Sequence, residues 1–206
     1  MTEAEARSAI SELNVSRETF ALLERYISIL NEWRSRINLI GPREFDQIWS
    51  RHVYDCVQLL PLIDDGATSV DLGTGAGFPG LVLACHAKSS GGAVTLVESV
   101  GKKCAFLADV VSKLQLPARI ENRRVESTEA QKADFVTARA FAPLPKLLDY
   151  AEPWLSGGAT GLFFKGERWR EELTQAEECW TLSYEAIPSR TSEAGVILKI
   201  TEAARV

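Results

Sequence analysis

The sequence predicts an α/β fold: a seven-stranded, mostly parallel sheet with an antiparallel edge, preceded by an N-terminal helical extension. Three observations lead to this prediction. The N-terminal third of the 206 residues keeps helical hydrophobic spacing. From about residue 68, short apolar runs alternate with helical patterns, which is typical of a parallel sheet covered on both faces. A glycine-rich turn follows the first of those runs. We expect a helical cap over residues 1–64 and a second part over residues 65–206, packed as one compact unit.

The N-terminal third contains no strand pattern. Thr2 and Glu5 have the spacing of a capping box, which predicts that a helix begins there. Apolar residues at helical spacing continue over 20–37, so we expect a long amphipathic helix. Gly41-Pro42 interrupts that pattern, and a further apolar stripe follows over 45–60. We therefore expect three helices before the first strand.

Seven short apolar runs predict the strands of the sheet. They lie at 68–72, 93–98, 118–123, 134–139, 159–165, 181–187 and 195–202. Helical patterns separate most of them, at 78–88, 101–115, 143–155 and 167–180. Because no helix lies between the last two runs, we expect these two strands to pair antiparallel at one edge. The other connections should be right-handed crossovers.

Composition and charge disfavour several classes of protein. The net charge of −5 argues against a wholly basic nucleic-acid binder, so any basic surface must be local. Four separated cysteines and two histidines, without a Cys-x-x-Cys pair, provide no pattern for disulfides or for a metal site. No apolar run approaches about 18 residues, so we expect no membrane span. We expect a cytoplasmic protein without bound metal, and a monomer.

The glycine-rich turn at 69–80 predicts a cofactor site. Asp71 ends an apolar run, and four glycines follow it closely. Glycine has no Cβ and tolerates positive φ, so a ligand can lie against the backbone of such a turn. The segment Gly75-x-Gly77-x-x-Gly80 satisfies the dinucleotide-binding pattern. The wider segment Asp71-x-Gly73-x-Gly75-x-Gly77 has the form of the first motif of S-adenosylmethionine (SAM) methyltransferases. The glycines alone leave both cofactors open.

Two further features bear on the cofactor. Glu98 ends the second apolar run about twenty residues past the glycines, where a carboxylate accepts hydrogen bonds from ribose hydroxyls. Both NAD and SAM contain that ribose. The antiparallel pair of last strands favours SAM, because a dinucleotide-binding fold ends in parallel strands. We therefore predict a Rossmann-like, class I SAM-dependent methyltransferase fold.

Charged residues follow the third and fourth apolar runs, where ligands gather in an open α/β sheet. Arg124-Val125-Glu126 could hold an adenine ring, although a charged surface loop explains that segment equally well. Arg139, flanked by alanines, could contact the cofactor, an RNA phosphate or a base edge, or form a structural ion pair. No Asn-Pro-Pro-Tyr, Asp-Pro-Pro-Tyr or Pro-Cys motif is present, which disfavours methylation of an exocyclic amine or of cytosine C5.

Several segments between roughly residue 20 and residue 200 carry a family resemblance. They are Asn38-Leu39, Arg51-His52-x-x-Asp55, Asp71-Leu72-Gly73-Thr74-Gly75-x-Gly77-Phe78-Pro79-Gly80, Glu98-Ser99-x-Gly101-Lys102-Lys103, Arg124-Val125-Glu126, Arg139-Ala140-Phe141-Ala142 and Lys165-Gly166. With them the chain resembles the RsmG (GidB) family, guanine-N7 methyltransferases of 16S ribosomal RNA. It departs mildly from that family at Cys56, where Ser is usual, and at Glu98, where Asp also occurs.

The resemblance implies SAM as the cofactor and a guanosine in the 530 loop of 16S rRNA (position 527 in the usual rRNA numbering) as the target. It also implies a set of SAM-site residues: Gly73, Phe78, Val125, Glu126 and Arg139, with Glu98 on the ribose. The glycine turn adds Asp71, Gly75 and Gly77 to these, with Asp71 and Gly73 expected at the methionine end of the cofactor.

Methylation at guanine N7 would need positioning rather than proton transfer. N7 has an in-plane lone pair and no proton, so it can displace the methyl group directly without a general base. We expect Arg139 to contribute to that positioning. Contacts with 16S rRNA, a small subunit or an assembly intermediate are expected at basic residues: Arg51, His52, Arg123, Arg124, Lys165 and Arg168. The alternatives are a nicotinamide-dependent dehydrogenase and a SAM-binding but catalytically silent RNA-binding or ribosome-binding module.

Overall fold

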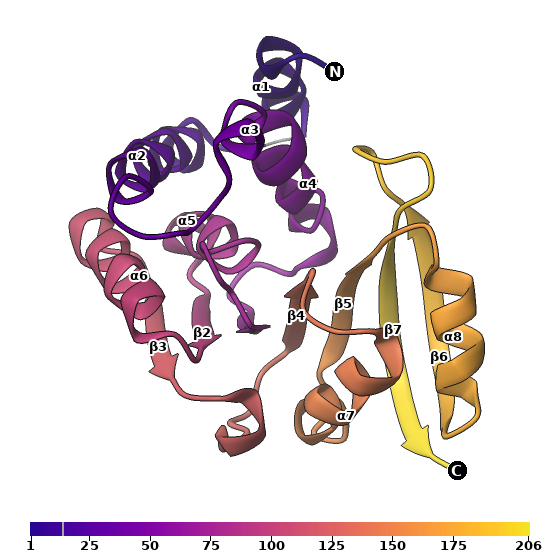
Figure 1. The fold of residues 1–206 in the computed structure, drawn as a ribbon. Coiled ribbons are helices and arrows are strands. Elements are labelled where there is room, and N and C mark those ends of the chain that lie inside the picture. The colour runs from indigo at the N-terminus through magenta and orange to yellow at the C-terminus, as the bar shows by residue number, and fades with distance from the viewer. Residues whose placement is uncertain (14) are drawn as a thin grey trace.

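The computed structural model describes residues 1–13 and 15–206, and a seven-stranded sheet runs through its centre (Figure 1). In spatial order the strands are β3 (Ala118–Asn122), β2 (Ala93–Glu98), β1 (Thr68–Leu72), β4 (Phe135–Arg139), β5 (Thr160–Lys165), β7 (Val196–Arg205) and β6 (Trp180–Pro188). Each lies where an apolar run predicted it. The strand order reverses between β1 and β4, and α/β sheets bind ligands beyond the strand C-termini at such a switch point.

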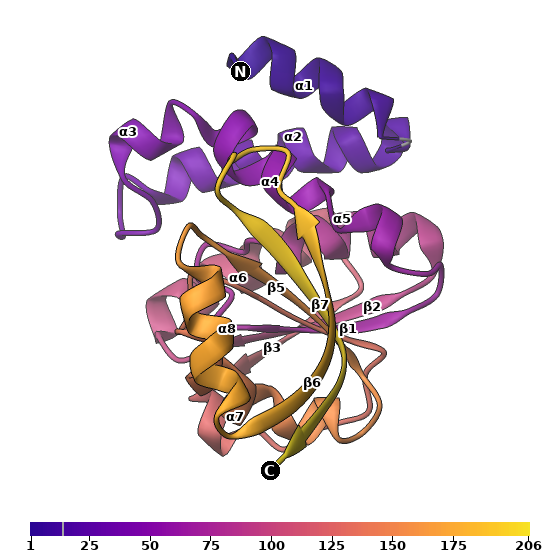
Figure 2. The ribbon, with the colours of Figure 1, turned by 90° about the vertical axis from the view of Figure 1, so that its right-hand side faces the viewer.

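The sheet is parallel except at one edge, as predicted. β1 pairs in parallel with β2 and β4, and β5 continues this parallel part. β7 runs antiparallel to both β5 and β6, and the long β6–β7 pair forms the edge (Figure 2). Lys165 at the end of β5 pairs with Val196 at the start of β7. The β6–β7 hairpin loop, residues 189–195, therefore reaches the same end of the sheet as the C-termini of β4 and β5.

Four helices cover the two faces of the sheet. α5 (Gly80–Ser90) and α6 (Gly101–Leu114) lie on one face, and α7 (Leu144–Leu155) and α8 (Trp169–Glu177) lie on the other (Figure 1). Each face has its own hydrophobic core. The predicted alternation of strands and helices is confirmed, because each apolar helix stripe packs on the sheet beside it.

The N-terminal extension packs on the outer side of α5 and α6. Its long helix, α2 (Arg17–Trp33), ends at Trp33 rather than at the predicted Ile37. The indole N–H of Trp33 donates to Asp109 of α6 at 2.7 Å. Tyr26 is fully buried, and its hydroxyl donates to the carbonyl of Ala76 in the glycine turn at 2.6 Å. The extension therefore shares a core with the sheet domain and supports the predicted cofactor turn.

The first helix begins as predicted. α1 (Glu3–Glu12) opens with a capping box in which the Thr2 hydroxyl accepts from the backbone N–H of Glu5. The Glu5 carboxylate in turn accepts from the backbone N–H of Thr2 at 2.7 Å. These bonds satisfy two N–H groups that a helix start leaves free.

The single helix predicted from the stripe at 45–60 is wrong. That segment is broken into α3 (Pro42–Phe45), the π-helical turn η1 (Trp49–Val53), α4 (Tyr54–Val57) and the 3₁₀ turn η2 (Leu60–Leu62). The Glu3 carboxylate of α1 accepts from the backbone N–H groups of Trp49 and Ser50, both at 2.9 Å. A helix running through from α3 would use those N–H groups itself, so the chain restarts at Trp49.

Candidate cofactor and acceptor site

The glycine turn between β1 and α5 forms one side of the predicted cofactor site. Gly73 has φ +67°, and a Cβ built on it would lie 2.2 Å from Cδ2 of Phe141. Neither the backbone conformation nor the available space admits a side chain at this position. Gly75, which also has positive φ, donates its N–H to the Glu98 carboxylate at 3.0 Å. The turn therefore presents bare backbone to a ligand.

Asp71 supports this turn from beneath. Its side chain is fully buried: Oδ2 accepts from the backbone N–H of Gly80, and Oδ1 accepts from the Thr137 hydroxyl, both at 2.9 Å. These bonds tie the turn to α5 and β4. Burial raises the pKa of Asp71 to about 6, although hydrogen bonds oppose the shift. The sequence predicted a contact with the methionine end of the cofactor, whereas the geometry favours holding the turn.

Gly77 and Phe78, also predicted to bind the cofactor, face the protein interior. A Cβ on Gly77 would lie 2.4 Å from Cδ1 of Leu81, so this glycine lets the turn pack against α5. Phe78 is buried, with its ring centroid 5.4 Å from that of Tyr26 and 5.2 Å from that of His52. Both residues support the site through packing.

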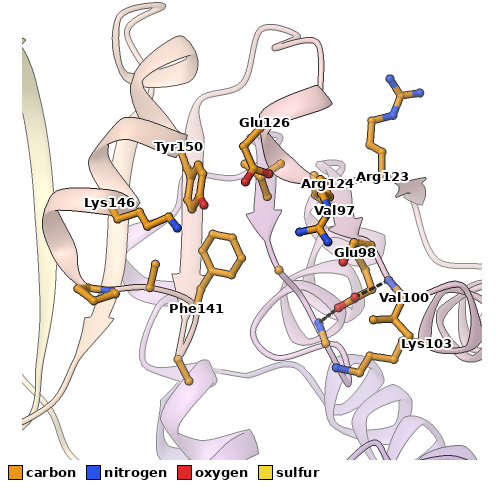
Figure 3. A pocket seen from close by; sticks show the side chains of 17 residues that line it. Val97, Glu98, Val100, Lys103, Arg123, Arg124, Glu126, Phe141, Lys146 and Tyr150 are labelled. Atoms are coloured by element: carbon orange, nitrogen blue, oxygen red, sulfur yellow. Dashed lines mark hydrogen bonds between the residues drawn. The ribbon is translucent and has the colours of Figure 1, made fainter.

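A cavity of about 500 Å³ opens beside the turn (Figure 3). Loops that follow the first four parallel strands in the chain contribute to its walls: Gly73 and Gly75 after β1, 97–100 at the end of β2, 123–126 after β3, and 140–143 after β4. Lys146 and Tyr150 of α7 complete the lining. The cavity is of the size of small-ligand sites and lies at the switch point of the sheet.

Glu98 places a carboxylate in this cavity. The residue is buried, and its Oε2 and Oε1 atoms accept from the backbone N–H groups of Gly75 at 3.0 Å and Val100 at 2.8 Å (Figure 3). A carboxylate has about four lone-pair positions, so acceptor capacity remains for ligand hydroxyls. The two backbone bonds fix the orientation of the carboxylate. This geometry suits the predicted contact with a ribose.

The far wall combines predicted residues with residues that the sequence did not indicate. Val125 and Glu126 line the cavity as expected. The backbone N–H of Glu126 and the Tyr150 hydroxyl hold the pKa of Glu126 below its usual value. The sequence assigned no role to Phe141, Lys146 and Tyr150, yet all three line the cavity. The ring centroids of Phe141 and Tyr150 lie 5.5 Å apart in this wall. The one-turn spacing of Lys146 and Tyr150 on the predicted helix is the signal that could have indicated a shared face.

A second cavity, of about 480 Å³, lies beyond the C-terminal ends of β4 and β5. Three parts of the chain line it: the N-terminal extension between Glu44 and Asp55, the strand ends at 139–140 and 164–166, and the β6–β7 hairpin between Ser189 and Val196. Ala140 lines both this cavity and the cofactor cavity. The residue after Arg139 therefore stands between the two spaces, where a cofactor and an acceptor would meet.

Arg139 is held in the second cavity by the helical extension. Its guanidinium donates to Asp55 Oδ2 at 2.7 Å and to the carbonyl of Arg51 at 3.1 Å, and it contacts His52 Nδ1. The side chains of Arg139 and Asp55 are each 15% exposed. Arg139 does not line the cofactor cavity itself. Arg139 thus forms a structural ion pair, which is one of the roles that the sequence left open. It also lies next to Ala140, at the boundary of the two cavities where the positioning hypothesis requires it.

Asp55 joins this arginine to the β6–β7 hairpin. Its Oδ1 atom accepts from the Thr191 hydroxyl at 2.6 Å and from the amide of Gln58 at 3.1 Å. Gln58 in turn accepts from the backbone N–H of Arg190 at 2.6 Å. One carboxylate thus connects the extension, β4 and the hairpin around the second cavity.

Two residues predicted to contact RNA are engaged inside the protein. Burial and the charges of Arg139 and Arg51 lower the pKa of His52 to about 3, so its imidazole is neutral and cannot form an ion pair with phosphate. The Lys165 side chain is only 6% exposed, and its Nζ lies 2.5 Å from the Glu172 carboxylate. A buried, paired ammonium is badly placed for a phosphate contact, which argues against the role expected for Lys165.

The other predicted RNA contacts are exposed arginines. Arg51 lines the second cavity, and Arg123 and Arg124 line the mouth of the cofactor cavity. Arg123 also pairs with Glu121 at 3.1 Å. Arg168 lies on the surface just before α8 and lines neither cavity. These four side chains remain available to a polyanion.

Neither a metal cluster nor a membrane-spanning helix is found in the described part of the chain. Across residues 1–13 and 15–206, no three His, Cys, Asp or Glu side chains gather where they could hold a metal ion. Over the same residues, each helix is too short or too polar to cross a bilayer.

Comparison with known proteins reveals close relatives along the whole chain. The model of a family described as "rRNA small subunit methyltransferase G" (GidB) matches residues 19–195. Ribosomal RNA small subunit methyltransferase G of Hyphomonas neptunium is 57% identical over 206 residues, which covers 100% of this chain and 99% of that protein. The protein of the same name from Gluconobacter oxydans is 43% identical and covers 93% of this chain and 98% of its own length.

Solved structures with a similar fold include SAM-dependent methyltransferases and a further protein solved with AdoMet. One from Aquifex aeolicus has a TM-score of 0.59 at 14% identity, covering 84% of this chain and 98% of that chain. TYW2 of M. jannaschii, solved in complex with AdoMet, has a TM-score of 0.55 at 16% identity, covering 75% of this chain and 76% of that chain. At these identities the similarity shows the fold alone.

Proposed function

This chain belongs to the rRNA small subunit methyltransferase G (GidB) family, and we propose that it methylates N7 of a guanine in the 530 loop of 16S ribosomal RNA. Family membership makes it a SAM-dependent rRNA methyltransferase. The choice of N7 as the acceptor atom goes beyond family membership and needs its own support. The observation that carries it is the state of the ionisable groups in the second cavity.

Asp55 and His52, which lie beside Arg139 in the lining of the second cavity, are already engaged. Asp55 pairs with Arg139, whereas the Glu44 carboxylate is exposed and accepts from the backbone N–H of Gly41 at 3.1 Å at the start of α3. His52 is neutral, with a pKa of about 3, and its Nδ1 faces Arg139. Methylation of an exocyclic amine must remove a proton, whereas guanine N7 carries a lone pair and no proton. Because Asp55 and His52, the ionisable groups beside Arg139, offer no free base there, this part of the cavity supports N7 as the acceptor.

The residues of the first cavity fit SAM. The bare backbone at Gly73 and Gly75 admits a ligand closely, and Glu98 can accept from ribose hydroxyls. Val125 offers an apolar surface beside the exposed Glu126, as an adenine ring requires. When bound, SAM supplies a sulfonium methyl group, which N7 takes with its lone pair while the C–S bonding electrons leave on sulfur. The protein supplies binding and alignment for this displacement.

Arg139 is the residue best placed to orient the base. Its guanidinium has five N–H groups, and its contacts with Asp55, Arg51 and His52 leave part of that donor capacity free. Guanine presents O6 next to N7 on its major-groove edge, so an arginine donor to O6 also fixes the direction of the N7 lone pair. Because Asp55 fixes the guanidinium, that donor is in place before the base arrives.

Mapping N7-methylguanosine in 16S rRNA tests the proposal. We expect cleavage specific for N7-methylguanosine in the 530 loop of rRNA from wild-type cells, and its absence from cells lacking this protein. Re-expression of the wild-type chain should restore it, whereas Gly73→Val should not, because the added side chain meets Phe141. If the methylation of the 530 loop is the same in cells that lack the protein, the proposal is refuted.

An assay with purified protein separates the proposal from a catalytically silent RNA-binding module. We expect transfer of the labelled methyl group from SAM to 16S rRNA, to small subunits or to an assembly intermediate, each offered separately. The preferred substrate form is the one with the highest kcat/KM. Tight SAM binding without transfer to any of the three would favour the silent module.

A further inference from the structure

The loop at 140–143 is held in an unfavourable conformation between the two cavities. Ala140 has φ +51°, a left-handed conformation that a residue with a Cβ rarely adopts. All four residues of the loop line the cofactor cavity, and the Phe141 ring packs against Gly73. A loop in such a conformation persists only where neighbouring groups hold it.

Lys165 and Glu172 hold this loop from behind. The Nζ of Lys165, at the end of β5, donates to the carbonyl of Ala142 at 3.0 Å. The Glu172 carboxylate of α8 accepts from the backbone N–H of Leu144 at 2.8 Å and lies 2.5 Å from Lys165 Nζ. One ion pair therefore contacts both the carbonyl inside the loop and the N–H just after it.

Glu172 replaces a cap that the local sequence cannot supply. α7 begins at Leu144, with Pro143 before it and Pro145 after it. Neither proline offers a side-chain acceptor, so the N–H of Leu144 needs a partner from elsewhere. A carboxylate at this helix start also interacts favourably with the helix dipole. Glu172 thus fixes where the loop ends and the helix begins.

We propose that Lys165 is a positioning residue that, together with Glu172, clamps loop 140–143 between the cofactor and the acceptor base. This rests on the proposed function, in which the base lies in the second cavity. The clamp keeps Phe141 against Gly73 and Ala140 at the boundary, so the methyl group and N7 meet in line. A misplacement of about 1 Å at this boundary costs on the order of 100-fold in rate.

The competing role for Lys165 is a direct phosphate contact, and the two roles predict different measurements. A missing phosphate contact weakens RNA binding and reduces the salt dependence of log Kd by about one unit of slope. Loss of the clamp lowers kcat and leaves RNA affinity and its salt slope unchanged. The experiment therefore needs both binding and turnover.

Two variants separate positioning from folding. Lys165→Met removes the ammonium but leaves the partly buried Glu172 carboxylate without its partner. Lys165→Met with Glu172→Gln also removes that stranded charge, while Gln still accepts from Leu144 N–H, so most of the lost Tm should return. Lys132→Met, an exposed lysine at the opposite end of the sheet, is the matched control. Arg168→Met is the comparison for an exposed basic residue.

We expect both Lys165 variants to lower kcat by about tenfold or more, with SAM and RNA dissociation constants within about twofold of wild type. In the double variant kcat should stay low although Tm recovers, because the Ala142 carbonyl has no donor. Recovery of kcat together with Tm would overturn the proposal in favour of a purely structural role. A weaker RNA affinity with a smaller salt slope would overturn it in favour of a phosphate contact. Turnover is scored as total methyl transfer to rRNA, so a different methylated nucleotide would refute the proposed target without affecting this result.

Discussion

The guanidinium of Arg139 and the carboxylate of Asp55 lie 2.7 Å apart, although 84 residues separate them in the chain. This ion pair joins the end of β4 to the N-terminal helical extension at the boundary of the two cavities. The extension is therefore part of the site, because it sets the position of the residue that we infer to orient the base.

Asp55→Ala should lower kcat by about tenfold to 100-fold, because Arg139 loses the group that holds it. SAM affinity should stay within about twofold of wild type, since Asp55 does not line the cofactor cavity. Single-turnover methyl transfer and SAM titration measure the two quantities. The control is Asp149→Asn, which breaks an ion pair whose partners are each 51% exposed and should change neither. Unchanged kcat in Asp55→Ala would contradict the inferred role of the pair.

Glu98→Gln should weaken SAM binding by at least about tenfold. Gln has one acceptor oxygen, so its NH₂ group would face one of the backbone N–H groups that now donate to Glu98. Calorimetric titration with SAM measures the change. Glu129→Gln, an exposed substitution outside the cavity, should bind SAM like wild type. Equal affinity of Glu98→Gln and wild type would remove Glu98 from the ribose site.

Asp71 should make stability depend on pH. Its pKa is raised from 3.8 to about 6 in the folded chain. The contribution of Asp71 to the free energy of unfolding is therefore fully present below about pH 4 and is lost as pH rises through about 6. The loss by pH 7 is on the order of 3 kcal/mol. In Asp71→Asn the amide oxygen can still accept from Gly80, and the amide nitrogen can donate to the Thr137 hydroxyl.

Thermal unfolding of wild type and Asp71→Asn between pH 4 and pH 7 tests this expectation. The Tm of wild type minus that of the variant should fall as pH rises, because only wild type must bury a charge. A difference that is constant with pH, or that grows, would show that Asp71 titrates at its ordinary pKa or below it.

RNA affinity should fall steeply with salt although the protein carries a net charge of −5. In a double variant, the exposed Arg51 and Arg168 are both changed to Gln. This variant should reduce the slope of log Kd against log salt by about 0.7 to 0.9 for each phosphate that is no longer neutralised. Filter binding of 16S rRNA across a salt series provides the slopes. Arg17→Gln is the control, because Arg17 is exposed at the start of α2, next to the far end of α5. A slope unchanged in the double variant would exclude both arginines as phosphate contacts.

Much of the fold, and the glycine turn and Glu98 of the cofactor cavity, could be predicted from local patterns in the sequence. The strands, the sheet helices, the antiparallel edge and the first capping box each depend on residues within a few positions of one another. The glycine turn and the strand-end Glu98 are equally local signals, and both line the cofactor cavity. Periodicity and capping are encoded at short range, which is why they can be predicted from the sequence.

The tertiary structure alone decided which polar groups are buried and which partners they have. Lys165, His52 and Asp71 carry the same side chains whether they face a ligand or the interior, so no local pattern distinguishes the two cases. Their partners come from other elements, and burial makes an unpaired charge costly enough to determine those partners. For the same reason the break at Trp49 depends on Glu3, which lies 46 residues earlier in the chain. The sequence by itself determined a SAM-binding sheet with a glycine turn, and long-range packing decided which residues touch the ligands and which hold those residues in place.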